Sequence, residues 1–65
     1  MRIRFKKTIA VDLYKNRLDE WWDKSYYHWD ELNIESLTYS HQTATIHTED
    51  ATLMDVPIDS FEVIV

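Results

Sequence analysis

The sequence predicts an all-β chain that folds as one domain over residues 1–65, a small barrel of about five short antiparallel strands. Apolar and polar residues alternate along the first segment, which is typical of a half-buried strand. Short stretches rich in β-branched residues then recur between polar turns. The hydrophobic fraction of 45% is that of a globular chain. A length of 65 residues accommodates one domain.

The first segment, Arg2 to Tyr14, is expected to form a strand with one buried face. Its apolar positions share one parity and comprise Ile3, Phe5, Ile9, Val11 and Leu13. Basic and polar residues, among them Arg2 and Arg4, occupy the other parity. Lys7 interrupts the apolar parity, so a bulge or bend is expected there.

The middle segment, residues 15–33, supports two alternatives. Apolar and aromatic residues recur at helical spacing, namely Leu18, Trp21, Trp22, Tyr26, Trp29 and Leu32. With Asn16 as its cap, a helix over about residues 17–32 would lie across a small antiparallel sheet and make the fold α+β. Aromatic residues, however, favour strands. The competing structure is an irregular hairpin of Leu18–Trp22 against Ser25–Trp29.

The remaining sequence predicts further strands and turns. A kink is expected near Glu35–Ser36, where the apolar parity changes. The expected strands are residues 43–48, with Ala44 and Ile46 on one face, residues 53–56, and residues 61–65, with Phe61, Val63 and Val65 on one side. Polar turns are expected at residues 40–42 and 49–51. Residues 57–60, where Pro57 fixes φ, are expected to form either a turn or a single 3₁₀ turn.

Three stretches together resemble the Src-homology-3-like (SH3-like) barrel family. Residues 29–37, WDELNIESL, resemble its diverging turn and second strand, residues 44–52 resemble its central hairpin, and residues 56–64, VPIDSFEVI, resemble its closing 3₁₀ turn and last strand. The resemblance implies the barrel, with residues 15–29 as the long first loop. It does not extend to polyproline recognition, because the hairpin stretch Thr43–His47 has no Trp. Short phage and bacterial proteins of unassigned role share this type of barrel.

Composition excludes several classes of function. The chain has no Cys and no Gly, so it lacks disulfides, thiolate-bound zinc, a cysteine nucleophile and a glycine-rich phosphate loop. The three histidines, His28, His41 and His47, have no recognised metal-ligand spacing. No apolar run approaches the roughly 20 residues of a membrane span. We therefore expect a cytoplasmic, non-enzymatic protein with neither cofactor nor bound metal.

An aromatic cluster is the candidate protein-binding site. Its residues are Trp21, Trp22, Tyr26, Tyr27 and Trp29, with an acidic rim of Asp19, Glu20, Asp23, Asp30 and Glu31. In a strand, adjacent residues point to opposite faces, so at least one ring of each adjacent pair is expected at the surface. The alternative is that these rings cover the barrel as a lid. The expected function is a protein-interaction module, such as an accessory or inhibitor protein that docks on a larger machine through an unidentified partner.

The charge distribution supports an alternative function linked to nucleic acids. All seven basic residues lie within residues 1–24, whereas residues 25–65 hold eight acids and no Lys or Arg. Arg2, Arg4 and Lys6 form a basic row that contacts phosphates in this alternative. The acidic remainder could instead mimic a nucleic acid, since the net charge is −5. A monomer and a homodimer both remain open.

Overall fold

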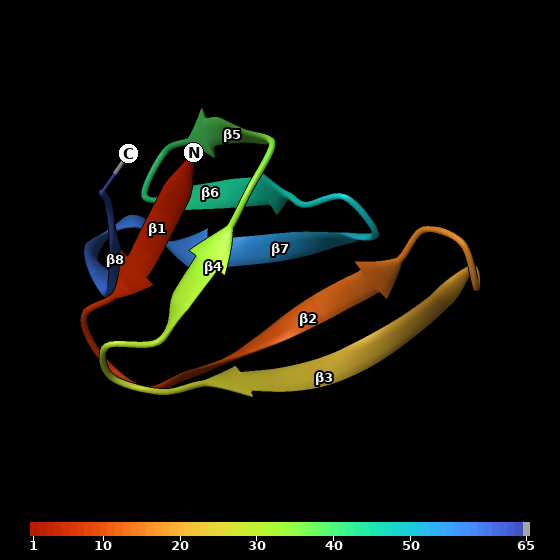
Figure 1. Cartoon of the computed structure of the whole chain (residues 1–65), viewed down its shortest axis with the longest axis horizontal. Coiled ribbons are helices and arrows are strands. Elements are labelled where there is room, and N and C mark those ends of the chain that lie inside the picture. Colours follow the sequence, from red (N-terminus) through yellow and green to blue (C-terminus); the bar gives the residue numbers. More distant parts are fainter. Residues whose placement is uncertain (65) are drawn as a thin grey trace.

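Two antiparallel sheets make up the protein in the computed structural model, which describes residues 1–64 (Figure 1). The first sheet has the order β4 (Glu31–Asn33), β1 (Arg2–Phe5), β8 (Phe61–Val63). The second has the order β3 (Glu20–Tyr26), β2 (Ile9–Lys15), β7 (Ala51–Pro57), β6 (Thr43–His47), β5 (Ser36–Ser40). The predicted all-β class is confirmed, but residues 1–64 form eight strands rather than about five.

The first predicted strand is divided by the bend that Lys7 indicates. β1 and β2 are separated by residues 6–8 and belong to different sheets. The N–H of Lys6 donates to the carbonyl of Ser60 at 2.7 Å, which holds the chain where it leaves β1. The predicted parity is confirmed, because Ile3, Phe5, Val11 and Leu13 are all buried.

Both predictions for the middle segment are wrong, since residues 17–32 form neither a helix nor a local hairpin. β3 instead pairs with β2 along its whole length, from Ile9 opposite Tyr26 to Lys15 opposite Glu20. The aromatic residues satisfy helical spacing only because they are so frequent, and their preference for strands prevails. The long first loop implied for residues 15–29 is likewise mostly strand.

The strands of the C-terminal half largely follow the sequence pattern. β6 buries Ala44 and Ile46 on one face, and a 3₁₀ turn, η1 (Ile58–Ser60), precedes β8. The predicted kink near residues 35–36 separates β4 from β5. Of the three terminal apolar residues, Phe61 is buried, Val63 is 47% exposed, and Val65 lies outside the described residues.

One core joins the two sheets. It contains the buried residues Ile3, Phe5, Val11, Leu13, Tyr26, Ile34, Ala44, Ile46, Ala51, Leu53, Val56 and Phe61. The side chains of Ile3, Ile46, Leu53 and Val56 are fully buried. Burial of such side chains is the main favourable term for so short a chain.

The chain makes its tight turns without glycine. Among residues 1–64, four have positive φ: Asp19 at 55°, Trp29 at 74°, His41 at 56° and Asp55 at 53°. Asp and His tolerate this left-handed region better than most residues, whereas a bulky Trp rarely adopts it. At the β6–β7 turn the chain uses a side chain instead, because the Oγ1 of Thr48 accepts the Ala51 N–H at 3.1 Å.

The φ of 74° at Trp29 leads to a stability prediction. A Cβ in the left-handed region costs roughly 1–2 kcal/mol, so Trp29→Gly should be more stable than Trp29→Ala by about 1 kcal/mol. Urea unfolding measures both variants. Trp21, within strand β3, is the matched control, and there the Ala variant should be the more stable one. An Ala variant at position 29 that equals or exceeds the Gly variant contradicts the prediction.

Candidate protein-binding site

The β2–β3 arm, defined as β2, β3 and the connecting turn Asn16–Asp19, carries most of the candidate site (Figure 1). β3 lies at the end of the five-stranded sheet and pairs there with β2. Six of its seven residues are exposed, and only Tyr26 is buried. The strand therefore presents side chains of both faces, as well as one backbone edge, to the surroundings.

Strand alternation divides the adjacent Trp residues between the two faces of the arm. Trp22 lies opposite Leu13, whose side chain is buried, so Trp22 is on the inner face that continues into the core. Trp21 lies opposite Tyr14 on the outer face, and the ring centroids of this pair are 5.2 Å apart. Trp21 is 62% exposed and Trp22 is 45% exposed. The sequence predicts at least one ring of this pair at the surface, and both are exposed.

Tyr26 belongs to the core and not to the binding surface in which the sequence placed it. Its ring stacks on Phe5 with a centroid distance of 4.6 Å, and the residue is 8% exposed. Burial raises the pKa of the Tyr26 hydroxyl, and the charges of Asp50 and Asp30 raise it further. The ring anchors the base of the arm.

Tyr27 and Trp29 lie beyond the base of the arm. Both are exposed, at 60% and 57%. The Trp29 ring contacts His28 at 4.4 Å and the Arg4 guanidinium at 5.5 Å, both centroid distances, which places Trp29 beside β1. Trp21 is five residues, or about 17 Å of strand, from Tyr26 at the base of the arm. The exposed rings of the predicted aromatic cluster therefore form two separate groups, Trp21 with Trp22 on the arm and Tyr27 with Trp29 beyond its base.

Two residues of the predicted acidic rim, Asp19 and Glu20, accept hydrogen bonds within the arm. Asp19 accepts a hydrogen bond from the Tyr14 hydroxyl. Glu20 accepts one from the Trp22 indole N–H at 3.1 Å. Asp23 lies directly opposite Asp12 of β2.

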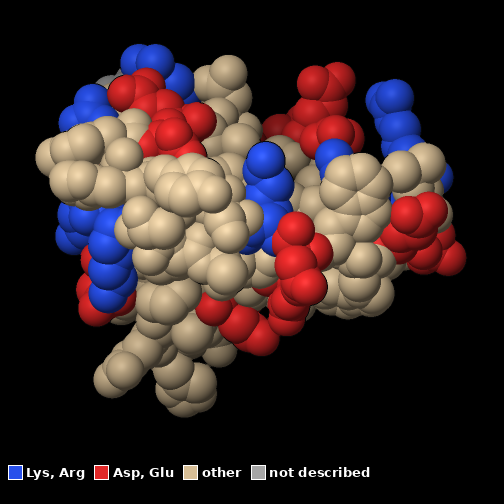
Figure 2. Space-filling view, turned by 90° about the horizontal axis from the view of Figure 1, so that it is seen from below, with Lys and Arg blue, Asp and Glu red and all other residues tan. Residues whose placement is uncertain are grey.

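Two lysines of the arm, Lys15 and Lys24, were missed by sequence reasoning. The Lys15 Nζ lies 4.9 Å from the centroid of the Trp22 ring, and the Lys24 Nζ lies 5.5 Å from that of Tyr26. Both lysines share a face of the arm with Trp22, and this common face could have indicated their role. It could be recognised only once residues 20–26 were known to form a strand. The view from below, the side on which β3 lies, shows basic and acidic side chains among uncharged surface (Figure 2).

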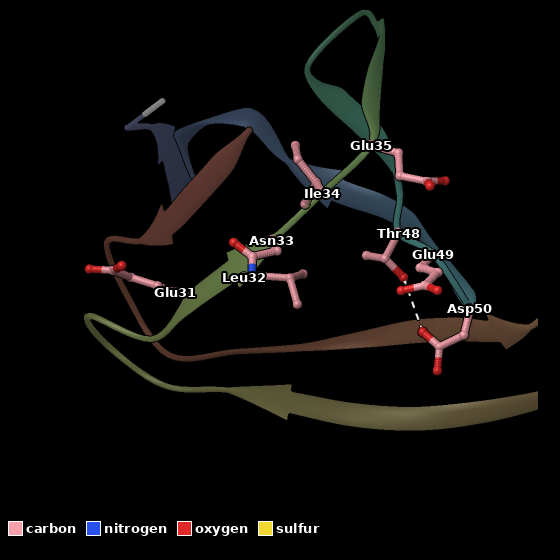
Figure 3. A pocket seen from close by; sticks show the side chains of 8 residues that line it. All are labelled: Glu31, Leu32, Asn33, Ile34, Glu35, Thr48, Glu49 and Asp50. Atoms are coloured by element: carbon pink, nitrogen blue, oxygen red, sulfur yellow. Dashed lines mark hydrogen bonds between the residues drawn. The ribbon is translucent and has the colours of Figure 1, made fainter.

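An open groove runs beside the inner face of the arm. The larger part of this groove has a volume of about 500 Å³ (Figure 3). One wall is β4 and the two residues that follow it, and the other wall is the β6–β7 turn. Its lining comprises Glu31, Leu32, Asn33, Ile34, Glu35, Thr48, Glu49 and Asp50. Leu32, Thr48 and Asp50 also line a smaller hollow with Trp22 and Lys24. Sequence reasoning missed this groove, because its walls come from distant segments.

Asp50 connects the groove to the arm. It accepts hydrogen bonds from Lys15 at 3.3 Å and from the Thr48 hydroxyl at 3.4 Å, the latter drawn in Figure 3. The hydrogen bond from Lys15 lowers the pKa of Asp50, and the charge of that ammonium lowers it further. The contact with Asp50 holds the Lys15 ammonium near the Trp22 ring.

The basic row of the alternative function is paired with acids. The Glu31 carboxylate of β4 accepts hydrogen bonds from the guanidinium groups of Arg2 at 3.0 Å and Arg4 at 3.3 Å. The Glu62 carboxylate of β8 lies 3.6 Å from the Arg4 guanidinium. Lys6 follows β1 in the bend. These contacts neutralise much of the charge that would meet a phosphate.

The histidines do not come together. His41 lies in the turn between β5 and β6, and His47 is at the far end of β6. Within residues 1–64, no group of three or more His, Cys, Asp or Glu residues is placed to hold a metal ion. The same part of the chain has no helix of the length and apolarity that crossing a membrane requires.

The chain matches no protein-family model, no curated protein and no solved structure. A function for the arm therefore has to be inferred from its own geometry and charges.

The contact between Lys15 and Asp50 leads to a pH prediction. A carboxylate whose pKa is lowered by folding stabilises the fold above its unfolded pKa, and this stability is lost as the pH falls through the folded pKa. Lys15→Met should raise the pKa of Asp50 and weaken this acid dependence, as measured by NMR titration of the side-chain carboxyl carbon. Lys7→Met, which removes the Lys7–Asp59 pair at the same 3.3 Å, is the control and should leave Asp50 unchanged. If the pKa of Asp50 is unchanged in Lys15→Met, Lys15 is not the cause of its lowered value.

Proposed function

We propose that this protein is a small, non-enzymatic protein-interaction module that docks on its partner through the β2–β3 arm. The observation that carries the proposal is the exposure of β3, an edge strand with two exposed Trp side chains that the core does not use. Trp and Tyr are enriched among the residues that dominate binding energy at protein interfaces. An accessory or inhibitory role on a larger assembly fits this mode of action.

The backbone of β3 supports docking by strand addition. The N–H of Asn16 donates to the carbonyl of Asp50 at 3.0 Å, so even-numbered residues at this end of β2 direct their backbone groups toward β7. Odd-numbered residues such as Leu13 then face β3, where their partner is Trp22. The backbone groups of Trp21, Asp23 and Ser25 consequently point away from β2, where an extended segment can pair with them.

Charges on β3 favour a specific partner over indiscriminate pairing. Exposed edge strands promote aggregation unless charges or other devices interrupt them. Asp23 and Lys24 lie in the middle of β3 and are both exposed. A partner strand must therefore match these charges.

We also propose that the two sheets have the SH3-like arrangement. Consecutive strands β4 and β5 belong to different sheets and are separated only by Ile34 and Glu35, as in a single bent strand. A 3₁₀ turn precedes the last strand. In this arrangement the arm takes the place of the family's long first loop.

Protein contact is favoured over direct contact with nucleic acid. Arg2 and Arg4 are already paired with Glu31 and Glu62. The net charge of −5 also repels a polyanion.

The proposal is tested by affinity capture from the lysate of the organism that encodes the protein, with and without nuclease. We expect the wild type to retain a stoichiometric protein that survives nuclease. Trp21→Ala should reduce its retention about tenfold or more, because it removes a central aromatic contact. Tyr39→Ala is the matched control, since Tyr39 is 59% exposed but lies on the opposite edge strand, β5.

Circular dichroism verifies that both variants fold. Equal retention by Trp21→Ala and the wild type rules out the arm as the docking surface. Material that disappears with nuclease points instead to the nucleic-acid alternative.

A further inference from the structure

We infer that the partner which fits the edge of β3 is a second copy of this chain, paired antiparallel with β3 about a two-fold axis at Trp22. This inference rests on the proposed function, because it uses the same arm. It adds the identity of the partner and the register of the contact.

Antiparallel pairing permits only certain registers between two copies of one strand. Residues that face each other have the same backbone orientation, either both toward the partner strand or both away from it. A two-fold axis through a strand that pairs with itself must therefore pass beside a residue that faces its own copy. The axis positions at or beside the middle of β3 are Trp22, Asp23 and Lys24, and each lets five or more residues of β3 pair with the second copy.

Charge distinguishes these three registers. An axis at Asp23 places Asp23 opposite itself, and an axis at Lys24 does the same with Lys24. Like charges directly across a sheet are destabilising, so these two registers are disfavoured.

The register centred on Trp22 is the complementary one. Glu20 then lies opposite Lys24 of the second copy, and the symmetry produces this pair twice. Trp22 faces Trp22 of the second copy, and Trp21 faces Asp23. Opposite charges and aromatic pairs across strands are both stabilising, and this register places no like charges opposite each other within β3.

The backbone orientation of β3 agrees with this register. Trp21 and Asp23 direct their backbone groups away from β2, so they form a hydrogen-bonded pair between the copies. Trp22 directs its backbone groups toward β2, so the Trp22 pair is of the non-hydrogen-bonded kind, in which side chains approach most closely. The pairing joins two five-stranded sheets into one continuous sheet.

The side chains at the proposed contact are already positioned. The Trp22 indole donates to Glu20 at 3.1 Å, and the Lys15 ammonium lies 4.9 Å from the ring centroid. Trp22 is 45% exposed and would become more buried on pairing. The opposite edge strand, β5, has no charged residue within Ser36–Ser40, so charge selects no register of self-pairing there.

Sedimentation equilibrium over a concentration series tests the inference. The wild type should dimerise reversibly. Glu20→Lys places Lys opposite Lys24 twice, and Lys24→Glu places Glu opposite Glu20 twice. Each single variant should weaken dimerisation about tenfold or more, because two attractive pairs become repulsive.

Rescue by complementary charge identifies the register. An equimolar mixture of Glu20→Lys and Lys24→Glu should form the heterodimer, since each Lys then faces a Glu. The double variant, which exchanges the two residues, should dimerise as the wild type does. Lys7→Glu makes the same charge change outside the arm, at the Lys7–Asp59 pair, and should leave dimerisation unchanged.

Three results overturn the inference. The first is a wild type that stays monomeric at the highest concentration reached, about 1 mM. The second is a dimer that survives both single variants. The third is a loss of dimerisation that neither the mixture nor the double variant restores. A monomeric wild type that still captures a foreign protein through Trp21 leaves the proposed function intact, so the two failures are distinguishable.

Discussion

The pairing of β2 with β7 is the interaction on which the arm depends. Leu13 and Leu53 lie opposite each other in this pair, and both are buried. A slip of one residue would turn Leu13 out of the core, so the register of β2 is strongly specified. β3 inherits that register through its own pairing with β2. The core thereby determines which Trp lies on which face of an exposed strand.

Local patterns predicted those parts of the fold in which neighbouring residues decide the structure. The alternation of apolar and polar residues around Ile3 and Phe5 was enough to predict β1 and its buried face. The same alternation around Ala44 and Ile46 was enough to predict β6. The prediction for residues 17–32 was wrong because their aromatic residues satisfy both helical and strand spacing. Only the long-range pairing with β2 settles this segment. The same limit applies to the site: the exposure of Trp21 followed from strand parity, whereas the burial of Tyr26 required its contact with Phe5.

Because the chain has no glycine, a residue with a strained backbone stands where the arm joins the first sheet. Trp29 has a φ of 74°, which the surroundings must enforce. Its N–H donates to the Phe5 carbonyl at 2.8 Å, and the Tyr27 N–H donates to Asp30 at 2.8 Å. These bonds fix the turn from both sides. The direction in which the chain leaves β3 for β4 is therefore defined, although the ring of Trp29 itself is largely exposed.

The charge asymmetry of the sequence reflects pairing within the fold more than a binding surface. Each ion pair found within residues 1–64 joins a basic residue from the first 15 to an acid that follows residue 24; the basic residues are Arg2, Arg4, Lys7 and Lys15, and the acids are Glu31, Asp50, Asp59 and Glu62. Glu20 and Lys24 take part in none of these pairs. They lie four residues apart on one face of an edge strand, with Trp22 between them. Opposite charges outside the ion pairs of residues 1–64, placed symmetrically about an exposed aromatic ring, are what a self-complementary interface requires.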